Sequence, residues 1–176
     1  MKTAGQRKLK NLVFIGMPGS GKTTISKRVA KLLRLPWYDC DSEIETEEQM
    51  SVAQIFNIKG EEYFRLKETA CIGRLSKLNG IVFAVGGGAV LRNADAIRRN
   101  SVVIYVKREL GSIASTIKPG TRPLLEDMKN LRRLYEERHL LYEKTGGYSV
   151  ANDGTIEDAA RKVCEIYYES AGYKRS

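Results

Sequence analysis

The stretch GMPGSGKTT, from Gly16 to Thr24, decides the fold of this chain. It follows the apolar run Leu12–Ile15, which has the composition of a buried strand, and it leads into Lys22–Leu33, which has the spacing of a helix. The stretch matches the pattern G-x-x-x-x-G-K-[ST]. Glycines in this pattern let backbone N–H groups point inward around phosphate oxygens, and the helix N-terminus adds partial positive charge. The stretch therefore predicts a phosphate-binding loop; the alternative is a glycine-rich turn with a surface lysine.

This loop supplies most of the contacts that we expect with a nucleotide. Lys22 would reach the β- and γ-phosphates and act in catalysis, and the Thr23 hydroxyl would bind Mg²⁺. ATP and Mg²⁺ are therefore the expected cofactors. The residues expected to bind the nucleotide here are Gly19, Ser20, Gly21, Lys22, Thr23 and Thr24. The pattern says nothing about the group that accepts the phosphate.

The rest of the chain alternates short apolar strands with helices. Strands are expected at Leu12–Ile15, Trp37–Tyr38, Ile81–Val85, Val102–Val106 and Tyr148–Ala151. Helices are expected at Lys22–Leu33, Glu61–Leu75, Ala94–Arg99, Asp127–Lys144 and Ile156–Ser170, with one more that Ser51 caps through Gln54. Such alternation indicates a parallel sheet covered on both faces. We predict one α/β domain over residues 1–176, a three-layer α/β/α sandwich around a five-stranded parallel sheet, with ligands beyond the carboxyl ends of the strands.

Composition narrows the choice of partners. The 176 residues carry a net charge of +9, which favours anionic partners. No Lys or Arg occurs between Arg34 and Lys59, and the acidic residues of this window would repel a nucleic-acid backbone, so we expect no nucleic-acid partner. No apolar run approaches the ~20 residues of a membrane helix, so we expect no membrane partner. Three cysteines without CxxC spacing indicate reduced thiols and a cytoplasmic location.

Two further stretches place polar groups or glycines at strand ends. Asp39 and Asp41 follow the expected strand Trp37–Tyr38. One carboxylate can serve Mg²⁺ through water, while the other orients a hydroxyl and accepts its proton; the alternative is a solvated acidic loop. Gly86–Gly88 end the strand Ile81–Val85, and three glycines let a ligand approach the backbone closely. The alternative there is a flexible turn.

Three arginines are candidates for binding anions. Arg65 stands three residues before Glu68 on an expected helix, where the alternative is a surface ion pair. Arg122 follows a Pro-Gly turn in KPGTRPLL, Lys118 to Leu125, as on a mobile flap that closes over a transferring phosphate; the alternative is a solvated side chain in a loop. Arg138 interrupts an otherwise apolar helix face, so its charge needs an anion. A substrate carboxylate suits its planar fork, and an internal glutamate is the alternative partner.

Taken together, these stretches resemble the shikimate kinase family of the P-loop, nucleoside-monophosphate-kinase-like group. The resemblance covers roughly residues 12–163. It rests on five stretches in this order, namely Asp39–Asp41, Gly60–Glu68, Gly86–Gly88, Arg122–Leu125 and Glu137–Tyr142. The resemblance implies ATP-dependent phosphorylation of the 3-hydroxyl of shikimate, on the pathway to chorismate and the aromatic amino acids. Two alternatives stay open: another small-molecule kinase of this fold, for gluconate or a nucleoside monophosphate, and a nucleotide-binding protein without this activity.

The resemblance also implies how the acceptor is held. Asp41, Arg65, Gly87 and Arg138 would bind shikimate. The two arginines would hold its carboxylate, and Asp41 would bind its hydroxyls and align the attacking one as a catalytic group. The acceptor-binding helices would lie at about residues 40–75.

The resemblance also implies which residues bind the nucleotide, the moving phosphoryl group and Mg²⁺. Lys22 and Arg122 would stabilise the moving phosphoryl group, and Arg122 would also bind the nucleotide from a lid at about residues 115–127. Thr23 and Asp39 would serve Mg²⁺. A monomer is the habit of the family.

The sequence departs from the family in two places. Ser115 stands where an arginine commonly lies over the adenine, so either Lys118 takes over part of that contact or the nucleotide binds more weakly. Thr145–Gly147 replaces the usual end of the helix that carries Arg138, and we expect its last turn to fray.

Overall fold

The computed structural model describes residues 9–116 and 128–170. The strands are β1 (Asn11–Ile15), β2 (Trp37–Asp39), β3 (Val82–Ala84), β4 (Ser101–Lys107) and β5 (Tyr148–Ala151). The helices are α1 (Lys22–Leu33), α2 (Cys40–Glu48), α3 (Val52–Lys59), α4 (Glu61–Leu75), α5 (Val90–Arg98), α6 (Leu110–Thr116), α7 (Met128–Thr145) and α8 (Ile156–Ser170). In this part of the chain, no helix has both the length and the apolar character that crossing a bilayer requires.

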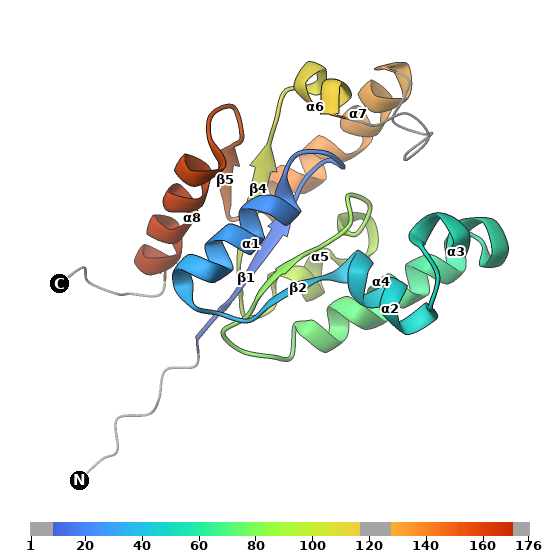
Figure 1. The fold of residues 1–176 in the computed structure, drawn as a ribbon, viewed down its shortest axis with the longest axis horizontal. Coiled ribbons are helices and arrows are strands. Elements are labelled where there is room, and N and C mark those ends of the chain that lie inside the picture. Colours follow the sequence, from blue (N-terminus) through green and yellow to red (C-terminus); the bar gives the residue numbers. More distant parts are fainter. Residues whose placement is uncertain (1–8, 117–127, 171–176) are drawn as a thin grey trace, which may run out of the picture.

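The strands form one parallel sheet in the order β2-β3-β1-β4-β5. The register pairs Ile15 with Tyr105 and Asp39 with Ala84, so the carboxyl ends of β1, β2, β3 and β4 meet at one edge (Figure 1). The predicted five-stranded parallel sheet is therefore confirmed. The central position of β1 places the loop that follows it in the middle of this edge.

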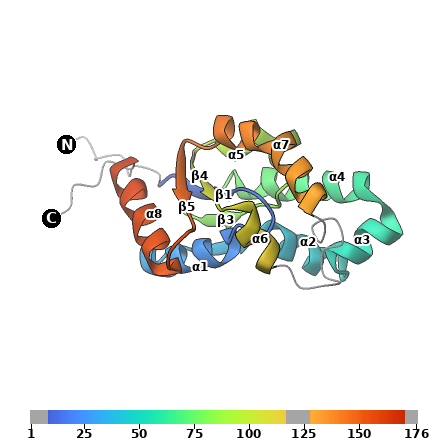
Figure 2. The same ribbon diagram turned by 90° about the horizontal axis from the view of Figure 1, so that it is seen from above.

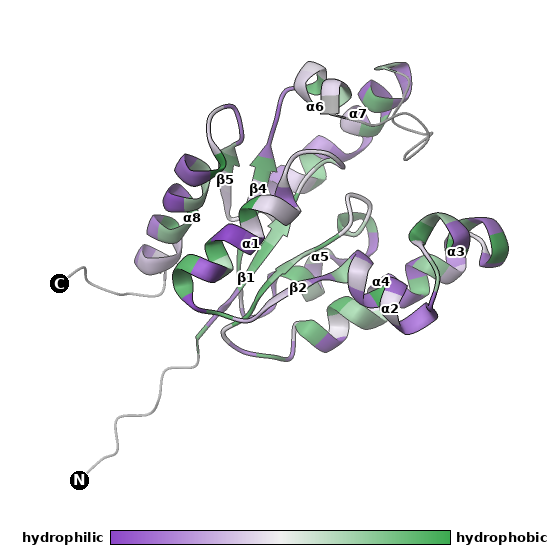
Figure 3. Cartoon of the chain, viewed as in Figure 1, coloured by the Kyte–Doolittle hydropathy of each residue, from purple (hydrophilic) through white to green (hydrophobic). Residues whose placement is uncertain are grey.

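Helices cover both faces of the sheet, which makes the three predicted layers (Figure 2). The helices α1 and α8 lie on one face, and α5 and α7 lie on the other. Each face of the sheet carries its own cluster of buried hydrophobic side chains, and the side chains of β1 alternate between them. Leu12 and Phe14 belong to the cluster under α1 and α8, while Val13 and Ile15 belong to the cluster on the other face. Strands that are buried on both faces read as continuous apolar runs, as the hydropathy colouring shows (Figure 3).

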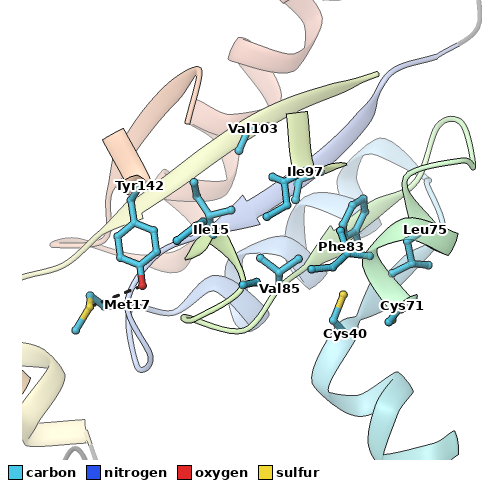
Figure 4. Close-up of a cluster of buried hydrophobic side chains, with 14 of the residues drawn as sticks. Ile15, Met17, Cys40, Cys71, Leu75, Phe83, Val85, Ile97, Val103 and Tyr142 are labelled. Atoms are coloured by element: carbon cyan, nitrogen blue, oxygen red, sulfur yellow. Dashed lines mark hydrogen bonds between the residues drawn. The ribbon is translucent and has the colours of Figure 1, made fainter. Parts of the chain in front are cut away.

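The larger core cluster joins the sheet to the helices that carry Arg65 and Arg138. Figure 4 shows Phe83 of β3 beside Leu75 of α4, with Val85, directly after β3, in the same cluster. At the other end of the cluster, Tyr142 of α7 reaches Met17. This packing fixes α4 and α7 relative to the carboxyl ends of the strands.

Most elements lie where the sequence predicts them, but α2 and α6 were missed. The helix α2 has the sequence CDSEIETEE, in which only Cys40 and Ile44 are buried. Two buried side chains in nine residues leave a weak apolar period, so the helix is hard to recognise from its sequence. The predicted cap of α3 is confirmed, because Ser51 and Gln54 form a reciprocal capping box.

The expectation that the last turn of α7 frays is wrong. The helix runs through Thr145, whose side chain is buried. The N–H of Gly146 donates to the carbonyl of Tyr142 at 2.7 Å, and the N–H of Gly147 donates to Val103 in β4 at 3.1 Å. The two glycines thus tie the helix end to the sheet.

An ionic cluster holds α2 against the helices that follow it. The carboxylate of Glu48 on α2 pairs with Lys59 at 2.5 Å and with Lys67 at 2.7 Å, and it accepts a hydrogen bond from the Tyr63 hydroxyl at 2.9 Å. Hydrogen bonds from Lys59 and then Lys67 lower the pKa of Glu48 to about 2, although partial burial acts in the opposite direction.

We expect the substitution Glu48→Gln to lower the free energy of unfolding at pH 7. A depressed pKa in the folded state contributes stability above the unfolded pKa, near 4.5, and this contribution is lost as the pH falls toward 2. The difference between parent and variant should therefore shrink below pH 4.5. Urea unfolding at pH 7 and pH 3.5 measures it, and an equal difference at both values would contradict the role of the charge.

Candidate active site

The glycine-rich loop between β1 and α1 has a backbone shape that depends on its glycines. Gly16, Gly19 and Gly21 have φ values of 144°, 79° and 95°, a region that favours glycine. A Cβ atom on Gly16 would lie 2.6 Å from the carbonyl oxygen of Val106, so only glycine fits beside β4. The loop ends at the N-terminus of α1, where free N–H groups and the helix dipole favour an anion.

Two side chains of the loop are buried at its centre. The Lys22 ammonium donates to the carbonyl oxygens of Gly16 at 2.9 Å and Met17 at 2.7 Å, so the lysine lies along its own loop. The hydroxyl oxygen of Ser20 is buried and has no hydrogen-bond partner among the described residues. A buried hydroxyl of this kind is expected to find a partner, and a phosphate oxygen or water in the loop would supply one.

Two residues that the sequence analysis missed hold the loop from outside. Asn152, directly after β5, donates its amide N–H to the carbonyl of Ser20 at 2.8 Å. Arg108, directly after β4, donates to the carbonyl of Gly19 at 3.1 Å. Neither residue belongs to a recognisable motif. Their one sequence signal is that each directly follows a strand that ends at this edge of the sheet.

The predicted Mg²⁺ residues lie side by side. The Thr23 hydroxyl donates to Oδ2 of Asp39 at 2.8 Å. The other carboxylate oxygen of Asp39 accepts the N–H groups of Asp41 and Ser42 at 3.1 and 3.4 Å, which caps α2 and fixes the carboxylate. One hydroxyl and one carboxylate suit Mg²⁺, which keeps several waters and takes further oxygens from substrate phosphates. The described residues contain no group of three or more His, Cys, Asp or Glu arranged for a metal.

Charged side chains from α2 and α4 converge at the glycines after β3. Arg65 pairs with Glu68 at 2.8 Å. A Cβ atom on Gly86 would lie 2.8 Å from Glu68 and 3.0 Å from Asp41, and one on Gly88 would lie 2.7 Å from the Arg65 guanidinium. The glycines are therefore needed here because the charged groups press against the backbone, and the alternative of a flexible turn does not describe this segment.

The pair of Arg65 and Glu68 is buried, so the alternative of a surface ion pair is wrong. The side chains are 12% and 1% exposed. Burial raises the pKa of Glu68, and the nearby Asp41 adds to the rise, while Arg65 and Arg138 oppose it. One oxygen of Glu68 is buried without a hydrogen-bond partner among the described residues. The sequence shows the spacing of Arg65 and Glu68 but does not show that the pair is buried.

Arg138 approaches the same group of charges from α7. Its Nε atom is buried and has no hydrogen-bond partner among the described residues. One turn later, the fully buried Tyr142 donates its hydroxyl to the carbonyl of Gly87 at 2.5 Å. Burial raises the pKa of Tyr142 well above its ordinary value, and the nearby Arg138 acts against that rise. Tyr142 thus fixes the backbone of Gly87 near Arg138, which is one turn earlier on the same helix.

Several predicted nucleotide contacts lie outside the described residues. These are Arg122, Lys118 and the part of the predicted lid beyond residue 116. Ser115 lies on α6, is exposed, and donates to the carbonyl of Ser112 within its own helix at 2.9 Å.

The segments that carry most of the other predicted residues meet at one edge of the sheet (Figure 1). The phosphate loop follows β1, Asp39 and Asp41 follow β2, and the glycines follow β3. Arg65 and Arg138 reach this edge from α4 and α7. A phosphate loop beside a cluster of charged side chains, on this order of strands, defines a P-loop kinase of the nucleoside-monophosphate-kinase-like class.

Within that class, the chain belongs to the shikimate kinase family, whose pattern it matches over residues 18–167. The shikimate kinase of Caldanaerobacter subterraneus subsp. tengcongensis is 40% identical over 171 residues, covering 93% of this chain and 99% of the relative. That of Clostridium botulinum strain Alaska E43 is 37% identical over 162 residues, covering 90% and 98%. The solved structure of Acinetobacter baumannii shikimate kinase in complex with shikimate matches with a TM-score of 0.85 at 28% identity and covers 96% of each chain.

Proposed function

We propose that this protein transfers the γ-phosphoryl group of ATP to the 3-hydroxyl of shikimate. The observation that carries the proposal is that the phosphate loop lies at the same edge of the sheet as a cluster of charged side chains with two arginines and an aspartate. Membership of the shikimate kinase family supports shikimate as the acceptor. A gluconate kinase has less support, and a protein that only binds nucleotides would not need the buried acceptor-side charges.

On the nucleotide side, residues Gly19–Thr24 would hold the phosphates of ATP. Their backbone N–H groups and the N-terminus of α1 offer fixed positive potential. The Lys22 ammonium, which now contacts carbonyls of the loop, would turn to the β- and γ-phosphates. Arg122 would add a second cation from the lid as charge develops on the moving group.

The pair of Thr23 and Asp39 would hold Mg²⁺. When bound, the ion neutralises charge on the β- and γ-phosphates. Thr23 sits at the start of α1, and Asp39 is fixed by its cap on α2, so both are already positioned at 2.8 Å from each other. Asp39 presents its Oδ2 atom, because its Oδ1 atom is taken up by the cap.

On the acceptor side, Arg65 and Arg138 would hold the carboxylate of shikimate. Glu68 orients Arg65 through its 2.8 Å contact, and Arg138 has a buried Nε that needs an acceptor. Asp41 would bind the hydroxyls, and Gly87 would let the ring approach the backbone. A neutral analogue without the carboxylate should bind more weakly than shikimate, and equal affinity would contradict the roles of both arginines.

The transfer itself requires little covalent chemistry from the protein. The 3-hydroxyl oxygen forms a bond to the γ-phosphorus, the bond from that phosphorus to the bridging oxygen breaks, and ADP leaves. Asp41 would align the hydroxyl and accept its proton. Holding both substrates in line removes much of the entropic part of the barrier.

We infer one kinase domain in which residues 40–75 form the acceptor-binding segment and residues 115–127 the lid. The packing of α2, α3 and α4 around Glu48 supports the first assignment. The cytoplasmic location and the monomeric state also stay predictions. Size-exclusion chromatography with light scattering tests the latter.

The substitution Tyr142→Phe should raise the KM for shikimate about three- to tenfold, with little change in the KM for ATP. It removes the hydrogen bond to the Gly87 carbonyl and leaves that oxygen unsatisfied beside the acceptor, a loss of about 1 kcal/mol or more. Tyr148→Phe, at an exposed tyrosine on β5, is the matched control. Equal KM values for shikimate in Tyr142→Phe and the parent would remove Gly87 from the acceptor site.

An acceptor panel tests the proposed function. ADP release is measured with ATP and Mg²⁺ in the presence of shikimate, gluconate, a nucleoside monophosphate or no acceptor. We expect release that depends on shikimate. Release with gluconate alone would favour the other kinase, and ATP binding with no acceptor-dependent release would leave a nucleotide-binding protein.

A further inference from the structure

Arg108 stands beside the phosphate loop without a role in the proposed reaction. It is the first residue after β4 and precedes α6 (Figure 1). The neighbouring strands bring it there, because β4 lies next to β1 and ends two residues beyond Tyr105, the partner of Ile15. Its side chain therefore leaves the sheet at the level of the loop that follows β1.

The contacts of Arg108 differ from those of the ion-paired arginines among the described residues. Arg28 and Arg65 each pair with a glutamate, at 2.6 and 2.8 Å. Arg108 forms no ion pair with any described carboxylate, and its guanidinium donates to the Gly19 carbonyl at 3.1 Å. Its Nε atom is buried and lacks a hydrogen-bond partner within residues 9–116 and 128–170. A partly buried guanidinium with no carboxylate partner is suited to an external anion.

The contact with Gly19 acts on the shape of the loop. In a trans peptide, the C=O and the next N–H point in opposite directions. The Gly19–Ser20 peptide is held at both ends, since its C=O accepts from Arg108 and its N–H donates to the carbonyl of Met17 at 3.1 Å. Asn152 holds the next peptide through the Ser20 carbonyl, which turns the Gly21 N–H away from Asn152.

We propose that Arg108 is a cationic positioning residue of the nucleotide site. Its guanidinium fixes the Gly19–Ser20 peptide and places a positive charge beside the loop, which strengthens the binding of a nucleoside diphosphate or triphosphate. The inference rests on the proposed function only in taking the loop to bind a nucleotide. Charge and hydrogen bond both contribute, and substitutions can separate them.

Three substitutions and a matched control test this role by calorimetric titration with ADP on the full chain. Arg108→Gln can still donate to the Gly19 carbonyl but has no charge, and we expect about tenfold weaker ADP binding. Arg108→Lys keeps the charge and should bind within about threefold of the parent. Arg108→Glu reverses the charge and should bind most weakly. Lys107→Gln removes one charge from the neighbouring residue, which pairs with Glu143, and should bind as the parent does.

Two further readouts exclude a merely structural role. The KM for shikimate should change less than twofold in Arg108→Gln. Its ADP affinity should also depend less steeply on salt concentration than that of the parent, because one charge is missing. The inference would be overturned if Arg108→Gln bound ADP as tightly as the parent. It would also be overturned if ADP affinity did not fall in the order Arg108→Lys, Arg108→Gln, Arg108→Glu. A parent chain that does not bind ADP would instead overturn the proposed function itself.

Discussion

Replacing Lys22 with alanine should lower kcat by about 10³-fold, because the substitution removes a cation placed where charge develops in the transition state. The lysine is buried in the loop, where it contacts the carbonyls of Gly16 and Met17. Its charge would thus need only a short movement to reach phosphates bound in the loop. Steady-state rates with saturating ATP and shikimate measure the effect.

Lys31→Ala is the matched control for Lys22→Ala. Lys31 lies in the last turn of the same helix and is exposed, so its loss should leave kcat within about twofold of the parent, as for most surface substitutions. Equal unfolding midpoints for parent and Lys22→Ala would show that the fold is intact. A Lys22→Ala rate within tenfold of the parent would contradict the role of the phosphate loop.

Replacing Arg138 with alanine should raise the KM for shikimate about 100-fold, with a smaller fall in kcat. The charged fork of an arginine on a carboxylate is among the stronger hydrogen-bonded pairs, and about 2.8 kcal/mol corresponds to this factor. The Nε atom of Arg138 is buried without a hydrogen-bond partner among the described residues, and Arg138 lies close enough to Glu68 to oppose the rise in its pKa that burial causes. A carboxylate of the acceptor would complete its hydrogen bonds.

Arg133→Ala controls for the loss of an arginine from α7. The side chain of Arg133 is 64% exposed, and its ion pair with Glu137 is long, at 4.0 Å, so little is lost when it is removed. It should leave the KM for shikimate unchanged. An unchanged KM in Arg138→Ala, together with a lowered free energy of unfolding, would place Arg138 in a structural ion pair. The two readouts therefore separate substrate binding from support of the fold.

The edge of the sheet where these residues meet follows from the sequence alone. The motif from Gly16 to Thr24 fixes the first strand and helix, and alternation of strands with helices then requires a parallel sheet. In such a sheet, all carboxyl ends lie at one edge, which brings Asp39 and Gly86 to the loop. Local sequence patterns and one rule of sheet topology were therefore sufficient to predict which segments meet at most of the candidate site.

Features that depend on packing between distant segments could not be predicted. Glu68 on α4 is buried where it packs against the backbone of Gly86, which follows β3. The end of α7 is ordered because the N–H of Gly147 donates to the carbonyl of Val103 in β4. Arg108 and Asn152 hold the phosphate loop across 89 and 132 residues of sequence. No local periodicity or motif reports such contacts, because they exist only after the strands have paired.

The most direct test of the account is to identify the product. The purified chain is incubated with ATP, Mg²⁺ and shikimate, and phosphorus NMR with proton coupling locates the new phosphate ester. We predict one phosphomonoester on the 3-hydroxyl of shikimate for each ADP formed. ADP accompanied by free inorganic phosphate, or an ester on another hydroxyl, would contradict the proposed alignment of the acceptor by Asp41, Arg65 and Arg138.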